Sequence, residues 1–138
     1  MSRRLAREIA FRALFQVDVG KCRTELALRH SLEDFNLEQP EQNFVHQLVE
    51  GAENNRSVLD EIIKKYLVKW EIDRLSAVDR NLLRLALYEI IYRPDIPHAV
   101  SINEALELAK KYGSSGEAVG FINGVLDRAV GEALENKT

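Results

Sequence analysis

Residues 76–93, with the sequence SAVDRNLLRLALYEIIYR, decide how this chain folds. At about 100° per residue, their apolar side chains cover most of the circumference of a helix. Polar side chains form a continuous strip only at Arg80, Asn81 and Arg84. A helix that is apolar nearly all round is surrounded by other elements, whereas a surface helix has a single apolar face. We therefore expect this helix to be central and the rest of the chain to pack around it.

The flanking residues mark the limits of this central helix. Ser76 followed by Asp79 is a capping-box pattern at its start. Pro94, just beyond its end, cannot continue a helix. Glu89 falls inside the apolar arc, where an unpaired carboxylate would cost free energy. We expect Glu89 to be buried against an arginine or several hydrogen-bond donors, as a structural group rather than a catalytic acid.

The composition is that of an ordinary globular protein. A chain of 138 residues suits one compact domain or two very small ones that share a core. Hydrophobic residues make up 46% and charged residues 30%. No apolar run approaches the length of a membrane span, and we expect no signal peptide and a cytoplasmic location. The single cysteine, Cys22, and three scattered histidines provide no metal-ligand pattern, so no metal or cofactor is expected.

Positive charge is concentrated at the amino end of an acidic chain. The formal net charge is −3, which argues against a general nucleic-acid binder. Residues 1–23, however, contain six basic and two acidic residues, whereas residues 24–61 contain two basic and nine acidic residues. A localised basic surface is therefore predicted near the amino terminus.

Helical periodicity runs along nearly the whole chain, and no segment has the two-residue alternation of a strand. We expect an all-α fold of about seven helices in two small bundles that share a core. The amino-terminal bundle is expected to cover residues 1–72 and the carboxyl-terminal bundle residues 73–138. Besides the central helix, helices are expected at about residues 2–19, 24–35, 41–54, 57–70, 101–112 and 114–135.

Serine and glycine positions refine these limits. Ser101 and Ser114 each precede a glutamate by three residues, so both are expected to cap helices. Gly20 is expected just past the end of the first helix. Gly120 and Gly124, one turn apart, are expected to let another helix approach closely.

The sequence carries no motif of a catalytic site. A glycine-rich phosphate loop, a nucleophile elbow, an HExxH pair and a Cys/His cluster are all absent. The carboxylates recur at charge-pair spacing on helix faces, which is typical of a solvated surface. We therefore expect a protein that is not an enzyme.

The strongest functional signal lies on the outer face of the first helix. There, charged residues alternate with two aromatic residues one turn apart: Arg4, Arg7, Glu8, Phe11, Arg12 and Phe15. Arginines neutralise phosphates, and an aromatic ring stacks on any base, so this pattern suits single-stranded nucleic acid. Alternatively, both rings dock the helix onto the second bundle, and each ring taken alone favours that interpretation. The arginines are the stronger signal.

A second candidate is FING, residues 121–124. Phe121 lies off the apolar stripe that contains Ile122 and Val125, which predicts an exposed ring. Asn123 inside a helix needs a hydrogen-bond partner. Its attachment to a neighbouring loop is favoured over contact with a ligand.

Three separated blocks of sequence resemble the NusB family of transcription antitermination factors. They are RRLARE (3–8) with ALFQ (13–16), VDR (78–80) with LRLALYE (83–89), and SINEALELAK (101–110) with FINGVLD (121–127). The blocks follow the family order along essentially the whole chain. Residues 20–60 match only in length and helical character.

The resemblance implies an all-helical fold of two small bundles. It implies binding to the boxA element of ribosomal RNA leaders, jointly with the ribosomal protein NusE, in a complex that joins RNA polymerase and opposes premature termination. By motif position, Arg3, Arg4 and Arg7 correspond to RNA-contacting arginines, and Phe121 to an RNA-contacting aromatic residue. Phe15 stands where the family often has tyrosine, which leaves stacking but removes the hydroxyl.

Two classes of function follow from the sequence. The favoured one is an antitermination factor that binds boxA RNA and NusE, with Arg3, Arg4, Arg7, Phe15 and Phe121 as RNA-binding residues. The alternative is a helical protein-interaction module or a homodimer, whose arginine face meets an acidic partner. Preference for a base sequence that survives moderate salt separates the first class from the second.

Overall fold

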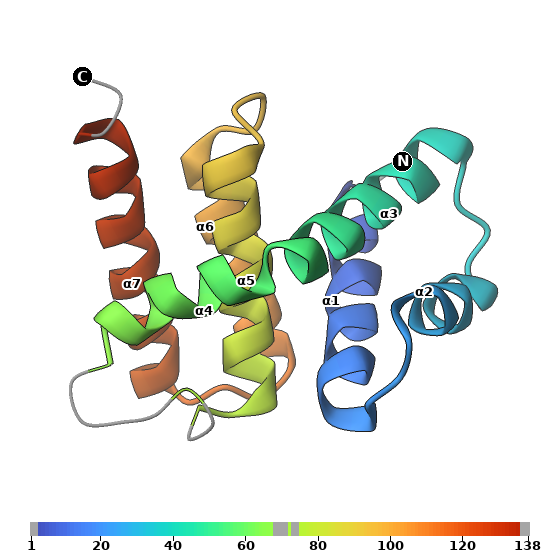
Figure 1. Ribbon diagram of the computed structural model, residues 1–138, viewed down its shortest axis with the longest axis horizontal. Helices are drawn as coiled ribbons and strands as arrows, with labels where there is room; N and C mark the ends of the chain where they lie inside the picture. The colour runs from blue at the N-terminus through green and yellow to red at the C-terminus, as the bar shows by residue number, and fades with distance from the viewer. Residues whose placement is uncertain (1–2, 68–71, 73–74, 136–138) are drawn as a thin grey trace. The chain divides into compact units, whose positions relative to one another are not determined.

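The computed structural model describes residues 3–67, 72 and 75–135, and within them the chain forms seven α-helices (Figure 1). These are α1 (Arg3–Gly20), α2 (Thr24–Glu33), α3 (Gln39–Asn54), α4 (Arg56–Lys65), α5 (Ala77–Tyr92), α6 (His98–Lys111) and α7 (Gly116–Glu135). No strand occurs in the described part of the chain, so the all-α prediction is confirmed.

The helices form two compact units, Met1–Asn55 and Arg56–Thr138. In the first unit, α1 packs against both α2 and α3. In the second unit, α5 contacts α4, α6 and α7. The helix expected to be central therefore touches every other helix of its own unit. The bundle division after residue 72 stays a prediction.

The start and the core of α5 agree with the sequence pattern. The Ser76 hydroxyl accepts a hydrogen bond from the Asp79 backbone N–H at 3.0 Å and caps the helix. Leu82, Leu83 and Leu87 have no exposed surface. Ile91, in contrast, is 37% exposed, because the apolar arc of this helix is wider than the surface its neighbours cover.

Two of the three residues of the polar strip of α5, Asn81 and Arg84, are buried as well. Arg84 donates from Nε and Nη2 to the two carboxylate oxygens of Asp60 on α4, at 2.7 and 3.0 Å. Its Nη1 donates to Asn81 Oδ1 at 3.2 Å, and Asn81 Nδ2 donates to the Ala77 carbonyl at 2.8 Å. Since buried polar groups need partners, this paired network lets α5 be covered along its polar strip too.

Glu89 is buried, as its helix position predicts, with 1% of its surface exposed. The Ser101 hydroxyl of α6 donates a hydrogen bond of 2.8 Å to Glu89 Oε1. The pKa of Arg93 is raised mainly by its hydrogen bond to Asp95, with a smaller contribution from the charge of Glu89. Glu89 therefore ties α5 to α6.

The predicted serine cap of α6 is wrong. This helix begins at His98, preceded by Pro97 with extended backbone angles, so Ser101 lies inside it. Residues 98–100, which precede the helix expected from residue 101, are consequently helical. The reason is that Glu89 recruits the Ser101 hydroxyl, which a capping role would have occupied.

The cap of α7 is one residue later than predicted. Ser115, and not Ser114, accepts the hydrogen bond from the Ala118 N–H, at 3.0 Å. The Ser114 hydroxyl instead donates to Asp79 Oδ1 at 2.6 Å and links the start of α7 to the first turn of α5.

The end of α6 has a left-handed backbone conformation that favours glycine, and Gly113 occupies it. Gly113 has a φ of 87°, and the Ser114 and Gly113 N–H groups donate to the Ala109 and Lys110 carbonyls at 2.9 and 3.3 Å. This is a Schellman motif. At the end of α1 the left-handed residue is Lys21, with a φ of 54°, rather than Gly20, which is still helical.

The predicted close approach at two glycines of α7 is wrong. Among the described residues, a Cβ atom added at Gly120 or Gly124 would meet no other atom within 4 Å. No described helix therefore packs closely against these glycines.

Several other predicted limits shift by a few residues. α3 begins at Gln39, ahead of the expected start at residue 41, so Pro40 occupies the first turn, where proline is tolerated. Leu26 of α2 is 38% exposed. The predicted helix start at Ser2, the helix end near Trp70 and the tail after Glu135 lie outside the described residues. None of the described helices is long and apolar enough to cross a membrane.

Candidate nucleic-acid interface

The orientation of the basic side chains of α1 is set by the packing of its apolar face. Ala6, Ile9, Ala13 and Leu14 have no exposed surface, in a unit where α1 packs on α2 and α3. The small side chains of Ala6 and Ala13 allow the helices to approach closely, and the burial of all four residues sets the rotation of α1. Arg3, Arg4 and Arg12 are left exposed.

Two arginines of α1 share one aromatic ring of α3. The guanidinium carbon of Arg3 lies 4.3 Å from the centroid of the Phe44 ring, and that of Arg7 lies 5.3 Å from it. Both distances are within the range of cation–π attraction. Arg3 is exposed, whereas Arg7 is only 4% exposed and Phe44 is 3% exposed. The outer position predicted for Arg7 is therefore wrong, because its side chain lies at the ring of Phe44.

The two aromatic residues of α1 have different environments. Phe11 is 2% exposed and belongs to the core. Phe15 is half-buried, and its ring centroid lies 6.2 Å from that of Phe11, with the planes inclined at 59°. Packing thus accounts for Phe11, whereas Phe15 keeps accessible surface on which a base can stack.

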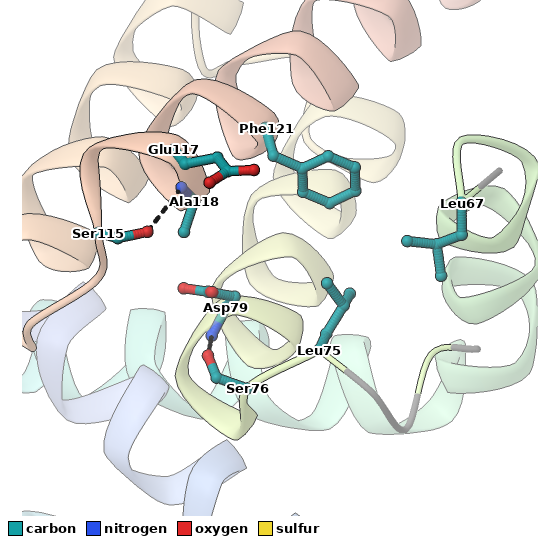
Figure 2. A pocket seen from close by; sticks show the side chains of 8 residues that line it. All are labelled: Leu67, Leu75, Ser76, Asp79, Ser115, Glu117, Ala118 and Phe121. Carbon is teal, nitrogen blue, oxygen red and sulfur yellow. Dashed lines mark hydrogen bonds between the residues drawn. The ribbon is translucent and has the colours of Figure 1, made fainter. Parts of the chain in front are cut away.

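The second candidate region is a pocket of about 340 Å³ in the second unit (Figure 2). It lies where α5 and α7 begin, and Leu67, Leu75, Ser76, Asp79, Ser115, Glu117, Ala118 and Phe121 line it. Figure 2 shows the phenyl ring of Phe121 projecting from α7 toward the space between Leu75 and Leu67. Phe121 is half-buried, so the predicted exposure of its ring is met in part.

Polar groups occupy the other side of this pocket. The Asp79 carboxylate is 8% exposed and accepts the hydrogen bond from Ser114. Glu117 is exposed, in the first turn of α7. An aromatic and aliphatic wall opposite hydrogen-bonding groups matches a flat ligand with one polar edge, such as an unstacked base.

The predicted RNA-binding residues fall in both units. Arg3, Arg4, Arg7 and Phe15 lie in the first unit, and Phe121 lies in the second. The basic helix start and the Phe121 pocket therefore belong to different units, and their union in one site stays a prediction.

The sequence did not single out Phe44 as part of the basic region. It lies on the apolar stripe of α3, which accounts for its burial. Its contact with the two arginines depends on how α1 crosses α3, and helix periodicity carries no such information. An aromatic residue beside arginines becomes a signal only after the two helices are paired.

A smaller pocket of about 260 Å³ lies between α2 and α3 and has an acidic lining. Thr24, Glu25, Leu28, Glu50, Glu53 and Asn54 surround it. Three carboxylates repel phosphate, so this pocket is unsuited to nucleic acid. Within the described part of the chain, no group of three or more His, Cys, Asp or Glu residues is placed to hold a metal ion.

Comparison with known proteins identifies one family. The family model described as NusB family matches residues 4–130. The transcription antitermination protein NusB of Desulforamulus reducens is 45% identical over 137 residues, which cover 99% of this chain and 92% of that protein. NusB of Bacillus subtilis is 48% identical over 126 residues, which cover 91% of this chain and 92% of that protein.

Solved structures agree with the sequence comparisons. T. maritima NusB superimposes with a TM-score of 0.87 at 37% identity, over 98% of both chains. A chain from a crystal structure of antitermination factors NusB and NusE in complex with dsRNA superimposes with a TM-score of 0.86 at 30% identity. That match covers 94% of this chain and 96% of the other.

Proposed function

This chain belongs to the NusB family, and on that premise we propose that it is an RNA-binding transcription antitermination factor. Its RNA ligand is the boxA element of ribosomal RNA leader transcripts, which it binds together with the ribosomal protein NusE. The resulting complex acts on elongating RNA polymerase in the cytoplasm. The protein works by binding and not by catalysis.

The observation that carries the proposal is the likeness to the chain solved with NusE and dsRNA, which extends over nearly the whole length of both chains. Since the likeness is not confined to one bundle, it supports a shared binding function as well as a shared fold.

The exposed arginines of α1 support an RNA-binding surface. Arg3, Arg4 and Arg12 give the first unit a local positive surface in a chain of net charge −3. Few phosphates can be neutralised by so small a patch, so the RNA affinity of the isolated protein is modest, and it depends on salt only through those few contacts. A second protein that extends the surface would raise the affinity, which fits a joint complex with NusE.

The proposed RNA-binding residues are Arg3, Arg4, Arg7, Phe15 and Phe121. Arg3 and Arg4 contact phosphates, and Arg7 contributes from its buried position. Phe15 and Phe121 provide aromatic faces for bases, since a ring stacks on any base. The apolar wall around Phe121 supports this assignment, because it shields one face of a stacked base from water.

The proposal is tested by titrating a labelled boxA RNA and a scrambled RNA of equal length, each with and without NusE. We expect preference for boxA at low and at moderate salt, and tighter binding when NusE is present. Equal affinity for the two RNAs contradicts the proposal. In that case sedimentation of the free protein tests the alternative, a homodimer or protein-interaction module.

A further inference from the structure

The ring of Phe44 contacts two cationic side chains, those of Arg3 and Arg7. Neither core packing nor surface charge alone explains this arrangement. Phe44 is 3% exposed, yet both the exposed Arg3 and the buried Arg7 place their guanidinium groups within 6 Å of its ring centroid. The two arginines are one helical turn apart, so they lie on the same side of α1. Phe44 thus binds that side of α1 to α3.

The contact restricts a side chain that would otherwise be mobile. An exposed arginine in the first turn of a helix samples many rotamers, and binding must fix one of them. An aromatic ring that attracts the guanidinium group fixes it before the ligand arrives. Such preorganisation raises affinity because less conformational entropy is lost on binding.

We propose that Phe44 is a positioning residue for RNA binding: its ring holds Arg3 in place for a phosphate, and Arg7 anchors the same ring from its buried position. This inference rests on the proposed function of the chain. It assigns a role to a residue that does not itself contact RNA, and it makes Arg7 act through its neighbours.

A double-mutant cycle separates positioning from core packing. Phe44→Leu keeps a buried apolar side chain but removes the aromatic face, and Arg3→Ala removes the positioned cation. With affinities corrected for the folded fraction, we expect Phe44→Leu to weaken boxA binding about three- to tenfold. In the Arg3→Ala background the same change should have almost no further effect, because the group that it positions is gone.

Two matched cycles serve as controls. Leu48→Ala, also at a fully buried position of α3, should have the same effect with and without Arg3. Arg12→Ala should combine additively with Phe44→Leu, because Arg12 is exposed elsewhere on α1. If the effects of Phe44→Leu and Arg3→Ala are also additive, Phe44 is only a core residue and the proposal fails.

A measurement without RNA distinguishes this proposal from the proposed function. In the free protein, the ring current of Phe44 should shift the Arg3 side-chain NMR signals, and Phe44→Leu should abolish the shift. A protein that shows this shift but binds no RNA contradicts the proposed function. A protein that binds boxA RNA but shows no shift overturns the positioning role.

Discussion

At the scale of the residue, the second unit depends on how its buried carboxylates are paired. Glu89 is 1% exposed and receives a hydrogen bond from Ser101. Ser101→Ala removes that donor and leaves the carboxylate less well solvated, so the free energy of unfolding should fall by about 1–3 kcal/mol. Chemical denaturation measures the change. Ser57→Ala, at an exposed position of α4, is the control and should stay within about 0.5 kcal/mol of the unaltered protein.

Two ion pairs of similar geometry should differ in how much they contribute to the free energy of unfolding. The Arg84–Asp60 pair has side chains that are 5% and 19% exposed, whereas those of Arg93–Asp95 are 18% and 54% exposed. Asp60→Ala leaves a buried guanidinium without its carboxylate and should cost about 3 kcal/mol of unfolding free energy. Asp95→Ala should cost less than about 1 kcal/mol, because water replaces the carboxylate. Equal urea midpoints for the two variants would contradict this ranking.

Tyr66 should make stability depend on pH in the alkaline range. Burial of its hydroxyl, followed by the influence of the nearby Glu132 carboxylate, raises the pKa of Tyr66 from 10.0 to about 12. No hydrogen bond of ordinary geometry to this hydroxyl occurs within the described residues. Since the unfolded chain ionises first, this contribution to stability is complete below pH 10 and is lost as the pH rises toward 12. Absorbance titration at alkaline pH, compared with Tyr66→Phe, should resolve one late-titrating tyrosine.

The burial of Glu89 was predictable and the burial of Arg7 was not. Glu89 lies on a helix that is apolar nearly all round, so every position except the polar strip is expected to be covered. Arg7 lies on a helix with one apolar face, and periodicity assigned it to the other half. Its side chain is long enough to reach Phe44 on α3, and only the pairing of the two helices reveals that target.

At the scale of the element, two glycines should respond in opposite ways to the same substitution. Gly113 has a φ of 87°, which disfavours a side chain, so Gly113→Ala should destabilise the protein by about 1 kcal/mol. Gly120 is helical and has open space around it, so Gly120→Ala should stabilise α7 by roughly 0.5–1 kcal/mol. Thermal unfolding of both variants measures the difference. A loss of stability in Gly120→Ala would mean that its Cβ meets a close neighbour.

The starts of α5, α6 and α7 show when local sequence is sufficient to predict which residue caps a helix. Ser76 caps α5 as predicted, with its hydroxyl accepting the hydrogen bond from the Asp79 N–H. Ser101 and Ser114 have the same spacing to a glutamate, but each donates to a buried carboxylate, Glu89 or Asp79. A charged acceptor forms the stronger hydrogen bond and therefore displaces the local cap. Helix limits near buried carboxylates could not be predicted without knowing which helices pair.

At the scale of the whole molecule, the all-α class and the family were accessible from the sequence, because both depend on patterns that persist along the chain. Periodicity identifies helices, and three separated motifs identify the NusB family. That Arg4 and Phe121 belong to one RNA site does not follow from such patterns, because the two residues lie in different units. Binding experiments on the intact protein test it directly.

Single variants of the two regions should change RNA binding in distinct ways. Arg4→Ala removes a phosphate contact, so it should weaken binding to boxA and scrambled RNA alike and reduce the magnitude of the log–log salt slope by about 0.7. Phe121→Ala removes a base stack, so it should cost roughly 1–3 kcal/mol and leave the salt slope nearly unchanged. Because Phe121 is half-buried, the melting temperature must be measured in parallel. If Phe121→Ala lowers the melting temperature by several degrees while the affinity of the folded fraction is unchanged, Phe121 is a packing residue, and the arginines of α1 bind RNA without it.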